Sequence, residues 1–170
     1  YNPVTDTWTP TNVADSPITR MSPVGVWTGT EMLVWGGNEW LFLGDLGDGA
    51  RYNPATDSWT PMNLLGAPTP RITQGVWTGS ELLLWGGTFD RTGGRYDPAT
   101  DAWQPTTLAG VPDSRIGGRW STVWTGTEMI IWGGIIETQR GARYCAASLT
   151  GIFIDGFASG NTSAWSAVLP

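Results

Sequence analysis

Histidine and lysine are both absent from this sequence of 170 residues, and cysteine occurs once, as Cys145. Without histidine, neither a Ser-His-Asp triad nor a Cys-His pair can form, and the thiol of Cys145 has no imidazole to deprotonate it. A single cysteine also excludes a disulfide within the chain, so packing alone must stabilise the fold. These absences exclude the commonest nucleophilic enzymes.

Positive charge and long apolar runs are scarce as well. Nine arginines stand against fifteen Asp and Glu residues, which gives a net charge of −6. Because no basic stripe exists, nucleic acid and anionic membrane surfaces are poor candidate partners. No apolar run is long enough to predict a transmembrane helix. Phosphate-binding and dinucleotide glycine loops are absent too, because the glycine pairs end strands that lead into loops rather than helices.

One stretch recurs three times and organises the rest of the chain. It reads VWTGTEMLVWGG at 26–37, VWTGSELLLWGG at 76–87 and VWTGTEMIIWGG at 123–134. Apolar, β-branched and aromatic residues on both sides of a short glycine turn are typical of a β-hairpin rather than a helix. The closing Gly-Gly indicates a backbone that takes positive φ or lies close to another segment, which glycine does without steric cost.

A second signature lies in phase with the first. YNPVTDTW at 1–8 returns as YNPATDSW at 52–59 and as YDPATDAW at 96–103. Asn-Pro or Asp-Pro opens a turn, the Asp that follows can accept from the amides of that turn, and the flanking Tyr and Trp are good strand residues. Two hairpins in a period of about 50 residues make four strands per unit, which indicates a propeller blade rather than a helical solenoid.

These motifs together carry a family resemblance. Arg20 and Arg71 precede the first strands, the second strands end in Gly-Gly, and a Tyr is followed by a Trp seven residues later. This pattern resembles the kelch repeat in its bacterial type, and the resemblance covers residues 1–144. It implies that Gly-Gly ends the second strand of each blade, that Tyr lies on the third strand, and that Trp lies on the outer fourth strand.

The third unit departs from this pattern in two places. Arg115 and Arg119 lie nine and five residues before Trp124, whereas Arg20 lies seven before Trp27. After Tyr144, the expected Asn-Pro turn is replaced by CAASL at 145–149. The fourth hairpin of the pattern is therefore not predicted by its usual residues.

The repeats divide the chain into kelch-like units and a tail. The expected units are a half blade at 1–10, a blade at 20–61, a blade at 71–105, a partial blade at 115–144, and a degenerate tail at 145–170 with one strand within 151–157. They amount to about twelve strands, whereas closed propellers have about four to eight blades of four strands. An open row of blades would expose its end faces and strand edges.

We therefore predict an all-β fold, namely a kelch-like β-propeller segment of four-stranded antiparallel blades that closes into a six-bladed ring as a homodimer. In this hypothesis, the 1–8 hairpin of each copy completes the 124–132 blade of the other. Two alternatives stay open: the chain is an open fragment of a longer propeller, or residues 150–157 complete the last blade within the same chain.

The resemblance also implies where ligands bind. In propellers of this connectivity, the loops that follow the second and fourth strands gather on one face around the channel mouth. The candidate binding residues that this placement brings together are Arg20, Glu39, Trp40, Asp45, Asp48, Arg71, Asp90, Arg91, Arg119, Glu137 and Arg140. Guanidinium and carboxylate groups can clamp an anionic or sugar-like ligand. The alternative is that these groups form Arg–carboxylate pairs that tie the blades together.

Two parts of one insertion invite further predictions. The apolar run WLFL at 40–43 should not face water, so it covers the channel mouth, packs on a second subunit, or offers Trp40 as a ligand platform. The acidic run DLGDG at 45–49 resembles carboxylate-rich calcium loops but lacks the ligand spacing of an EF-hand. Asp45, Asp48 and Asp90 are the candidate ligands of a divalent cation such as calcium.

The function expected from these observations is a binding module that presents its channel-mouth loops to a protein, glycan or small-molecule ligand. The alternative is a hydrolase or lyase whose channel carboxylates and arginines act with a divalent metal. A bacterial extracellular or cell-surface location is slightly favoured. The carboxylates that recur in every unit, Glu31, Glu81 and Glu128 in one turn and Asp6, Asp57 and Asp101 in the other, are expected on the opposite face, where they indicate turn chemistry rather than a site.

Overall fold

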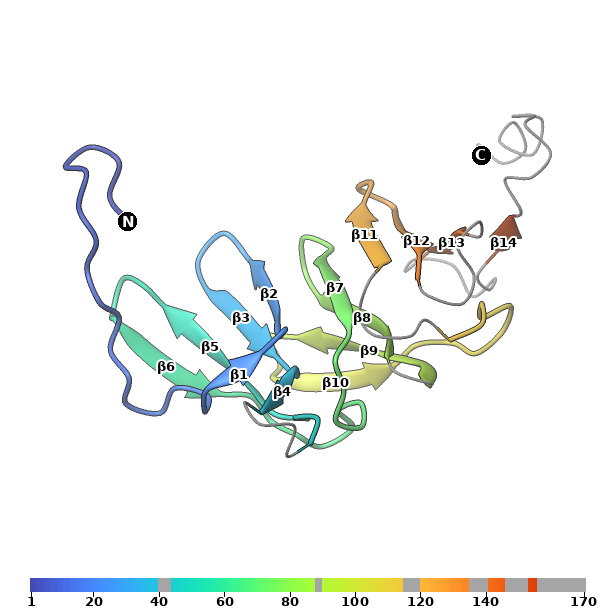
Figure 1. Ribbon diagram of the computed structural model, residues 1–170, viewed down its shortest axis with the longest axis horizontal. Helices are drawn as coiled ribbons and strands as arrows, with labels where there is room; N and C mark the ends of the chain where they lie inside the picture. Colours follow the sequence, from blue (N-terminus) through green and yellow to red (C-terminus); the bar gives the residue numbers. More distant parts are fainter. Residues whose placement is uncertain (40–43, 88–89, 115–119, 135–140, 146–152, 156–170) are drawn as a thin grey trace.

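The structure is a computed structural model that describes residues 1–39, 44–87, 90–114, 120–134, 141–145 and 153–155. These residues form fourteen β-strands in antiparallel sheets and contain no helix, which confirms the predicted all-β fold (Figure 1). Accordingly, no helix in the described part of the chain is long and apolar enough to span a membrane.

Three four-stranded sheets follow one another along the chain. The first sheet contains β2 (Val24–Trp27), β3 (Met32–Trp35), β5 (Gly49–Asn53) and β6 (Ser58–Pro61). The second contains β7 (Gln74–Trp77), β8 (Leu82–Gly87), β9 (Asp90–Asp97) and β10 (Ala102–Pro105). The third contains β11 (Trp120–Trp124), β12 (Glu128–Gly133), β13 (Gly141–Cys145) and β14 (Phe153–Asp155). In each sheet the spatial order equals the chain order, and a small pair of β1 (Arg20–Met21) and β4 (Asn38–Glu39) flanks the first.

The Thr-Gly stretches form the predicted hairpins between the first and second strands of each sheet. In the first sheet, the Thr28 hydroxyl accepts the N–H of Glu31 at 2.9 Å, and the N–H of Thr28 donates to the Glu31 carbonyl at 2.9 Å. The second and third sheets repeat both bonds. The closing glycines also behave as predicted, since Gly36 and Gly37 have φ values of 68° and 90°.

The Tyr-to-Trp stretches close the outer hairpins with one recurring set of contacts. Tyr96 donates its hydroxyl to Asp101 at 2.6 Å, and its ring lies 5.0 Å from that of Trp103. The same hydroxyl bond joins Tyr52 to Asp57 at 2.6 Å. Asp57 and Asp101 take positive φ, which an Asp tolerates in a turn better than most side chains.

The core lies between neighbouring sheets. Leu33 and Trp35 of the first sheet pack against Leu82 and Leu84 of the second. On its other face, the second sheet packs Trp85 and its neighbours against β11–β13 of the third. The first strands β2, β7 and β11 therefore lie side by side, as Figure 1 shows. Because successive side chains of a strand point to opposite faces, β8 contributes to the core on both sides of the second sheet.

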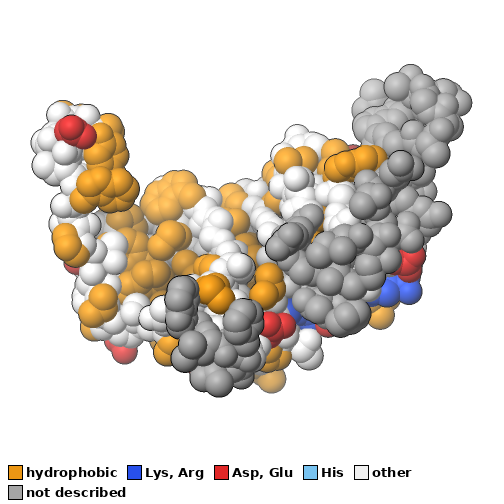
Figure 2. Space-filling view, viewed as in Figure 1, with side chains coloured by type: hydrophobic (Ala, Val, Ile, Leu, Met, Phe, Trp, Pro, Cys, Tyr) orange, Lys and Arg blue, Asp and Glu red, His pale blue; other side chains and the backbone are white. Residues whose placement is uncertain are grey.

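The N-terminal hairpin, residues 1–8, repeats the outer-hairpin motif without a sheet to pack on. The hydroxyl of Tyr1 donates to Asp6 at 2.7 Å, and one bridge joins Asn2 to Thr7. Trp8 is 81% exposed, and the hairpin stands away from the sheets with its hydrophobic side chains in view (Figure 2). The motif thus forms locally, from its own turn bonds.

At the other end of the chain, β14 forms within the predicted 151–157 range. It pairs with β13, so that Ala142 faces Ile154 and Arg143 faces Phe153. Together, β13 and β14 occupy the third and fourth positions of the third sheet, which the shared-blade hypothesis gives to the hairpin of a second copy. This arrangement follows the alternative in which the chain completes its own last sheet.

Candidate functional site

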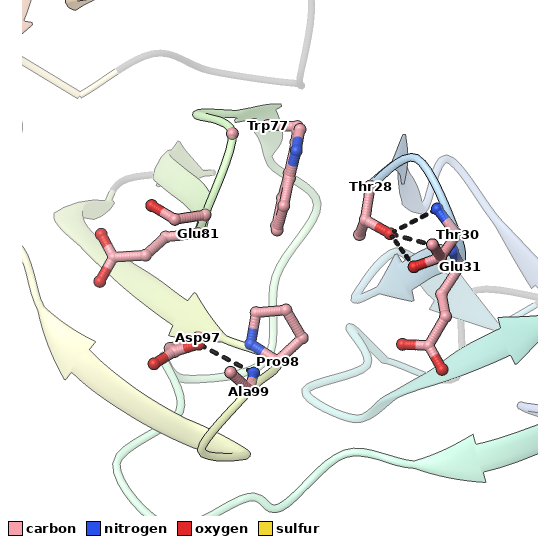
Figure 3. Close-up of a pocket in the computed structure, with 10 residues that line it drawn as sticks. Thr28, Thr30, Glu31, Trp77, Glu81, Asp97, Pro98 and Ala99 are labelled. Atoms are coloured by element: carbon pink, nitrogen blue, oxygen red, sulfur yellow. Dashed lines mark hydrogen bonds between the residues drawn. The ribbon is translucent and has the colours of Figure 1, made fainter.

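A cleft opens between the first and second sheets at the edge that carries the Thr-Gly turns. Its volume is about 600 Å³. The cleft is lined by the β2–β3 turn, the β7–β8 turn and the start of the β9–β10 turn, through Thr28, Thr30, Glu31, Trp77, Gly79, Ser80, Glu81, Asp97, Pro98 and Ala99 (Figure 3). Three turns far apart in sequence therefore form one concave surface.

Trp77 supplies the aromatic wall of this cleft. It is the last residue of β7, and its half-buried ring packs against the core between the first two sheets. In Figure 3 its ring stands between the Glu81 turn and the turn that carries Thr28 and Glu31. Because β7 and the core fix the ring, it offers a rigid apolar surface to a ligand.

Two of the three carboxylates in the cleft already have partners. Asp97 accepts from the N–H of Ala99 at 2.8 Å and from the hydroxyl of Thr100 at 2.9 Å, so it maintains its own turn. Glu81 lies 3.8 Å from the Arg95 guanidinium of the same sheet. These two groups shape the cleft and contribute negative potential, but their main contacts are internal.

Glu31 departs from the repeat. In the third sheet, Glu128 pairs with Arg143 at 3.4 Å, just as Glu81 pairs with Arg95. The arginine at the same repeat position in the first sheet is Arg51, and it donates instead to the carbonyl of Pro98 in the second sheet at 2.8 Å. In the described part of the chain, neither a hydrogen bond nor an ion pair engages the Glu31 carboxylate. The cleft thus contains one carboxylate that the fold leaves available.

The tyrosine beneath the cleft stays protonated. Burial first, and then the hydrogen bond to Asp101, raise the pKa of Tyr96 well above its ordinary value, while the nearby Arg51 acts to lower it. Tyr96 is fully buried, so its hydroxyl holds the Asp101 turn. It is therefore a poor candidate for a general base.

The arginines predicted to bind a ligand make mainly internal contacts. Arg20 donates to the carbonyls of Gly36 and Asp48 and pairs with the Asp48 carboxylate at 3.0 Å. Arg71, which is 3% exposed, bonds the carbonyls of Thr69, Gly86 and Thr92 and pairs with Asp90 at 2.8 Å. Burial lowers the pKa of Arg71, and the charge of Asp90 opposes that effect.

These pairs connect the Gly-Gly ends of the strands to neighbouring segments. The N–H of Gly37 donates to the Arg71 carbonyl at 3.0 Å, and the N–H of Arg71 donates to Leu46 at 3.1 Å, so the first two sheets are joined here. A side chain at Gly36 or Gly37 would collide with backbone atoms of neighbouring segments. This geometry suits the alternative in which the arginines tie the repeats together.

The remaining predicted site residues that are described lie at the same edge. Glu39 is on β4 opposite Arg20, Asp45 lies close enough to Arg71 to affect its pKa, and the half-exposed Arg91 donates to the carbonyls of Val111 and Pro112. Among the described residues, no group of three or more His, Cys, Asp and Glu side chains is placed to hold a metal ion. Trp40, Arg119, Glu137 and Arg140 lie outside the described residues.

The sequence did not single out the cleft. It placed Glu31 and Glu81 correctly in recurrent turns. Because the turns have the same sequence pattern, the sequence does not show that Glu31, unlike Glu81, has no arginine partner in the described part of the chain. Whether Arg51 pairs with Glu31 or donates to the Pro98 carbonyl depends on how the first two sheets pack.

Cys145 offers no alternative chemistry, since burial and its 3.2 Å contact with Glu128 raise the pKa of its thiol.

Comparison with known proteins does not assign this chain to a family. No protein-family model matches it, and no curated protein matches it either. The functional argument therefore rests on the geometry of the cleft.

Proposed function

We propose that this chain is a kelch-like β-propeller segment that acts as a binding module, and that its ligand is a protein whose arginine or lysine side chain enters the cleft. Three four-stranded antiparallel sheets that repeat in phase, with their first strands adjacent, support the propeller interpretation. The binding surface in this proposal is the Thr-Gly edge rather than the Gly-Gly edge, because Arg20 and Arg71 already bond internally.

The observation that carries the proposal is the Glu31 carboxylate, which lines the same cleft as the Trp77 ring and has no internal partner among the described residues. A carboxylate that has lost its internal partner favours a cation over a neutral group, since the ion pair adds to hydrogen bonding. A guanidinium or ammonium over the face of Trp77 gains a cation–π interaction as well. Asp97 and Glu81 add negative potential, and the net charge of −6 steers basic partners toward the chain.

The predicted alternative, a metal-dependent hydrolase or lyase, has less support. At the Gly-Gly edge, Asp48 and Asp90 pair with arginines, and the cleft holds no activated nucleophile among its lining residues. A concave surface with one aromatic wall and a few polar groups is sufficient for recognition. Binding is therefore the function that we carry forward.

Titration with a minimal probe tests the proposal. We expect N-acetyl-arginine amide to shift the indole N–H signal of Trp77 in an NMR titration, and the neutral isostere N-acetyl-citrulline amide to bind more weakly. Glu31→Gln should weaken arginine-amide binding about five-fold, because a half-exposed ion pair contributes about 1 kcal/mol. Glu128→Gln is the matched control, since its carboxylate is paired with Arg143 in the third sheet.

Three results would overturn the cation proposal. One is equal binding of the citrulline probe, and another is an arginine-amide affinity that Glu31→Gln leaves unchanged. The third is a shift of Trp77 by a neutral oligosaccharide but not by the arginine probe, which would make the ligand a glycan.

A further inference from the structure

A second pocket lies on the face of the first sheet that points away from the second sheet, which we call the far face. Its volume is about 240 Å³. The sheet contributes Val34 and Trp59 to the wall, and the loop of residues 11–18 contributes Pro17 and Ile18. Since an apolar cavity of about 150 Å³ can take up benzene, this pocket has room for a larger aromatic ring.

The walls of this pocket are built as they are beside the second sheet, where residues 62–69 form the equivalent loop. In both places the N–H of a loop asparagine donates to an aspartate of the outer turn, and the indole N–H of the outer tryptophan donates to the carbonyl of that asparagine. The bonds are Asn12 to Asp57 and Trp59 to Asn12, both at 2.9 Å, and Asn63 to Asp101 at 3.0 Å and Trp103 to Asn63 at 2.9 Å. The pocket is therefore fixed by internal bonds before a ligand binds.

Beside the second sheet, the side chain of Trp35 fills the equivalent place. Trp35 is the last residue of β3 and is fully buried, and its ring lies 5.6 Å from the ring of Trp103. Leu84, which repeats the position of Val34, belongs to the same buried cluster. The chain thus shows which side chain these walls accept, namely an indole at the end of a β-strand.

The surface next to the pocket is open as well. Trp27 is 53% exposed, whereas Trp77 at the same repeat position packs against the core between the first two sheets. A Cβ added at Gly75 would come within 3.0 Å of Val24 in the preceding sheet, but a Cβ added at Gly25 would meet nothing within 4 Å. Among the described residues, no sheet packs on the far face, so a strand that brings an indole to the pocket has a surface to lie on.

A second copy of this chain is a poor source of that indole. Its Trp35 and Trp85 are fully buried in its own core. Its third sheet would bring β13 and β14 to the place that the repeat gives to the 1–8 hairpin on the far face, since both correspond to β5 and β6. A partner protein with an accessible strand does not carry these outer strands.

We propose that the pocket beside Trp59 binds a tryptophan side chain that a β-strand of a partner protein presents. The ring takes the place that Trp35 has beside the second sheet, and the strand lies over Gly25 on the far face. Fixed walls lower the cost of ordering on binding, and a buried indole is among the side chains that contribute most to an interface. The site lies apart from the cleft, so the proposal goes beyond the proposed function and does not depend on Glu31.

An NMR titration of the whole ¹⁵N-labelled chain with N-acetyl-tryptophan amide tests the site. We expect the probe to shift the indole N–H signal of Trp59 and to leave that of Trp103 unchanged, because Trp35 occupies the second pocket. N-acetyl-arginine amide should leave Trp59 unshifted. The signals of Trp59 and Trp77 therefore report on this proposal and on the cation proposal separately.

A strand-borne indole is tested with the peptide acetyl-EMLVWGG-amide, which has the sequence of residues 31–37. The peptide should shift the Trp59 signal, and the same peptide with serine in place of tryptophan should not. A serine peptide that shifts Trp59 equally would contradict recognition of the indole.

Two variants change the wall of the pocket. Val34→Phe places a ring in the pocket and should abolish the Trp59 shift, and Val4→Phe, the same substitution at a 91% exposed residue outside the pocket, is the matched control. Ile18→Ser changes a half-exposed wall residue and should weaken binding about five-fold, because it removes apolar contact area. Circular dichroism of each variant checks that the sheets are retained.

Several outcomes would overturn the proposal. No Trp59 shift at any concentration of the tryptophan probe would do so, as would binding that both Val34→Phe and Ile18→Ser leave unchanged. A Trp59 signal that shifts with the concentration of the chain itself would make a second copy the occupant. Binding of the probe only after Trp8→Ser would show that the N-terminal hairpin of the same chain fills the pocket.

Discussion

Single arginines and aspartates join the repeats, and Arg71 is the clearest case. Its guanidinium is buried and bonds three carbonyls and the Asp90 carboxylate. Arg71→Met should lower the free energy of unfolding by about 3–5 kcal/mol, because it removes the cation that pairs with Asp90 and leaves several buried carbonyls without this donor. Arg91→Met is the control and should change stability little, since that side chain is half exposed. Urea unfolding measures both, and equal effects would contradict the role given to Arg71.

Asp101 gives a prediction with a pH dependence. Burial acts to raise the pKa of Asp101, but hydrogen bonds from Tyr96 and from the N–H of Asn63, at 2.6 and 3.0 Å, outweigh it and hold the pKa below its ordinary value. A carboxyl with a lowered folded pKa stabilises the fold above its unfolded pKa of about 3.9, and this stabilisation is lost as pH falls through the folded value. Asp101→Asn should therefore be less stable than the wild type at pH 7 and approach it in acid.

The matched substitution lies in the N-terminal hairpin. Asp6 accepts the equivalent hydroxyl, that of Tyr1, but the exposed hairpin packs on no described sheet, so Asp6→Asn should leave global unfolding unchanged at every pH. Thermal unfolding from pH 7 to pH 3 measures both variants. A difference between Asp101→Asn and the wild type that stays constant down to pH 3 would contradict the assignment.

At this scale the sequence predicted the turns well and the site poorly. The positive φ of the paired glycines and the strands around each Thr-Gly turn follow from local steric rules. The carboxylate left unpaired at Glu31 does not, because Arg51 reaches across to Pro98 only when two sheets are packed. Recurrence of a residue type identifies its turn, whereas its partners are set by tertiary contacts.

At the scale of the element, the same strand position is constrained only where a neighbouring sheet covers it. Gly75→Ala places a Cβ 2.6 Å from Leu84 and 3.0 Å from the Leu83 carbonyl. It should lower the free energy of unfolding by about 1–3 kcal/mol, which is typical of overpacking a core. Gly25→Ala meets no atom within 4 Å and has no positive φ, so it should be neutral or stabilise by about 0.5 kcal/mol through the unfolded chain.

Denaturant titration at a low protein concentration, where copies are separate, compares these two variants. Equal destabilisation would contradict the view that Gly25 lies on an open face.

The pairing of β14 with β13 shows how far the repeat pattern predicts strands. The CAASL segment at 145–149 breaks the motif, yet the third sheet still has a fourth strand, which comes from farther along the chain.

At the scale of the whole molecule, the sheets form a row in which each packs on its neighbours. Local stability is therefore expected to differ along the chain. The second sheet is covered on both faces, and every residue of β8 is buried. Among the described residues, the first and third sheets are each covered by a neighbouring sheet on one face, and the N-terminal hairpin on none. In such a row, opening begins at the uncovered ends and the central unit opens last.

Hydrogen exchange followed by mass spectrometry should resolve this order. At low concentration, we expect the slowest amide exchange in β8, intermediate rates in β3 and β12, and the fastest in residues 1–8. Uniform exchange across the three sheets would contradict this order, because it would mean that the coverage of a sheet by its neighbours does not set its local stability.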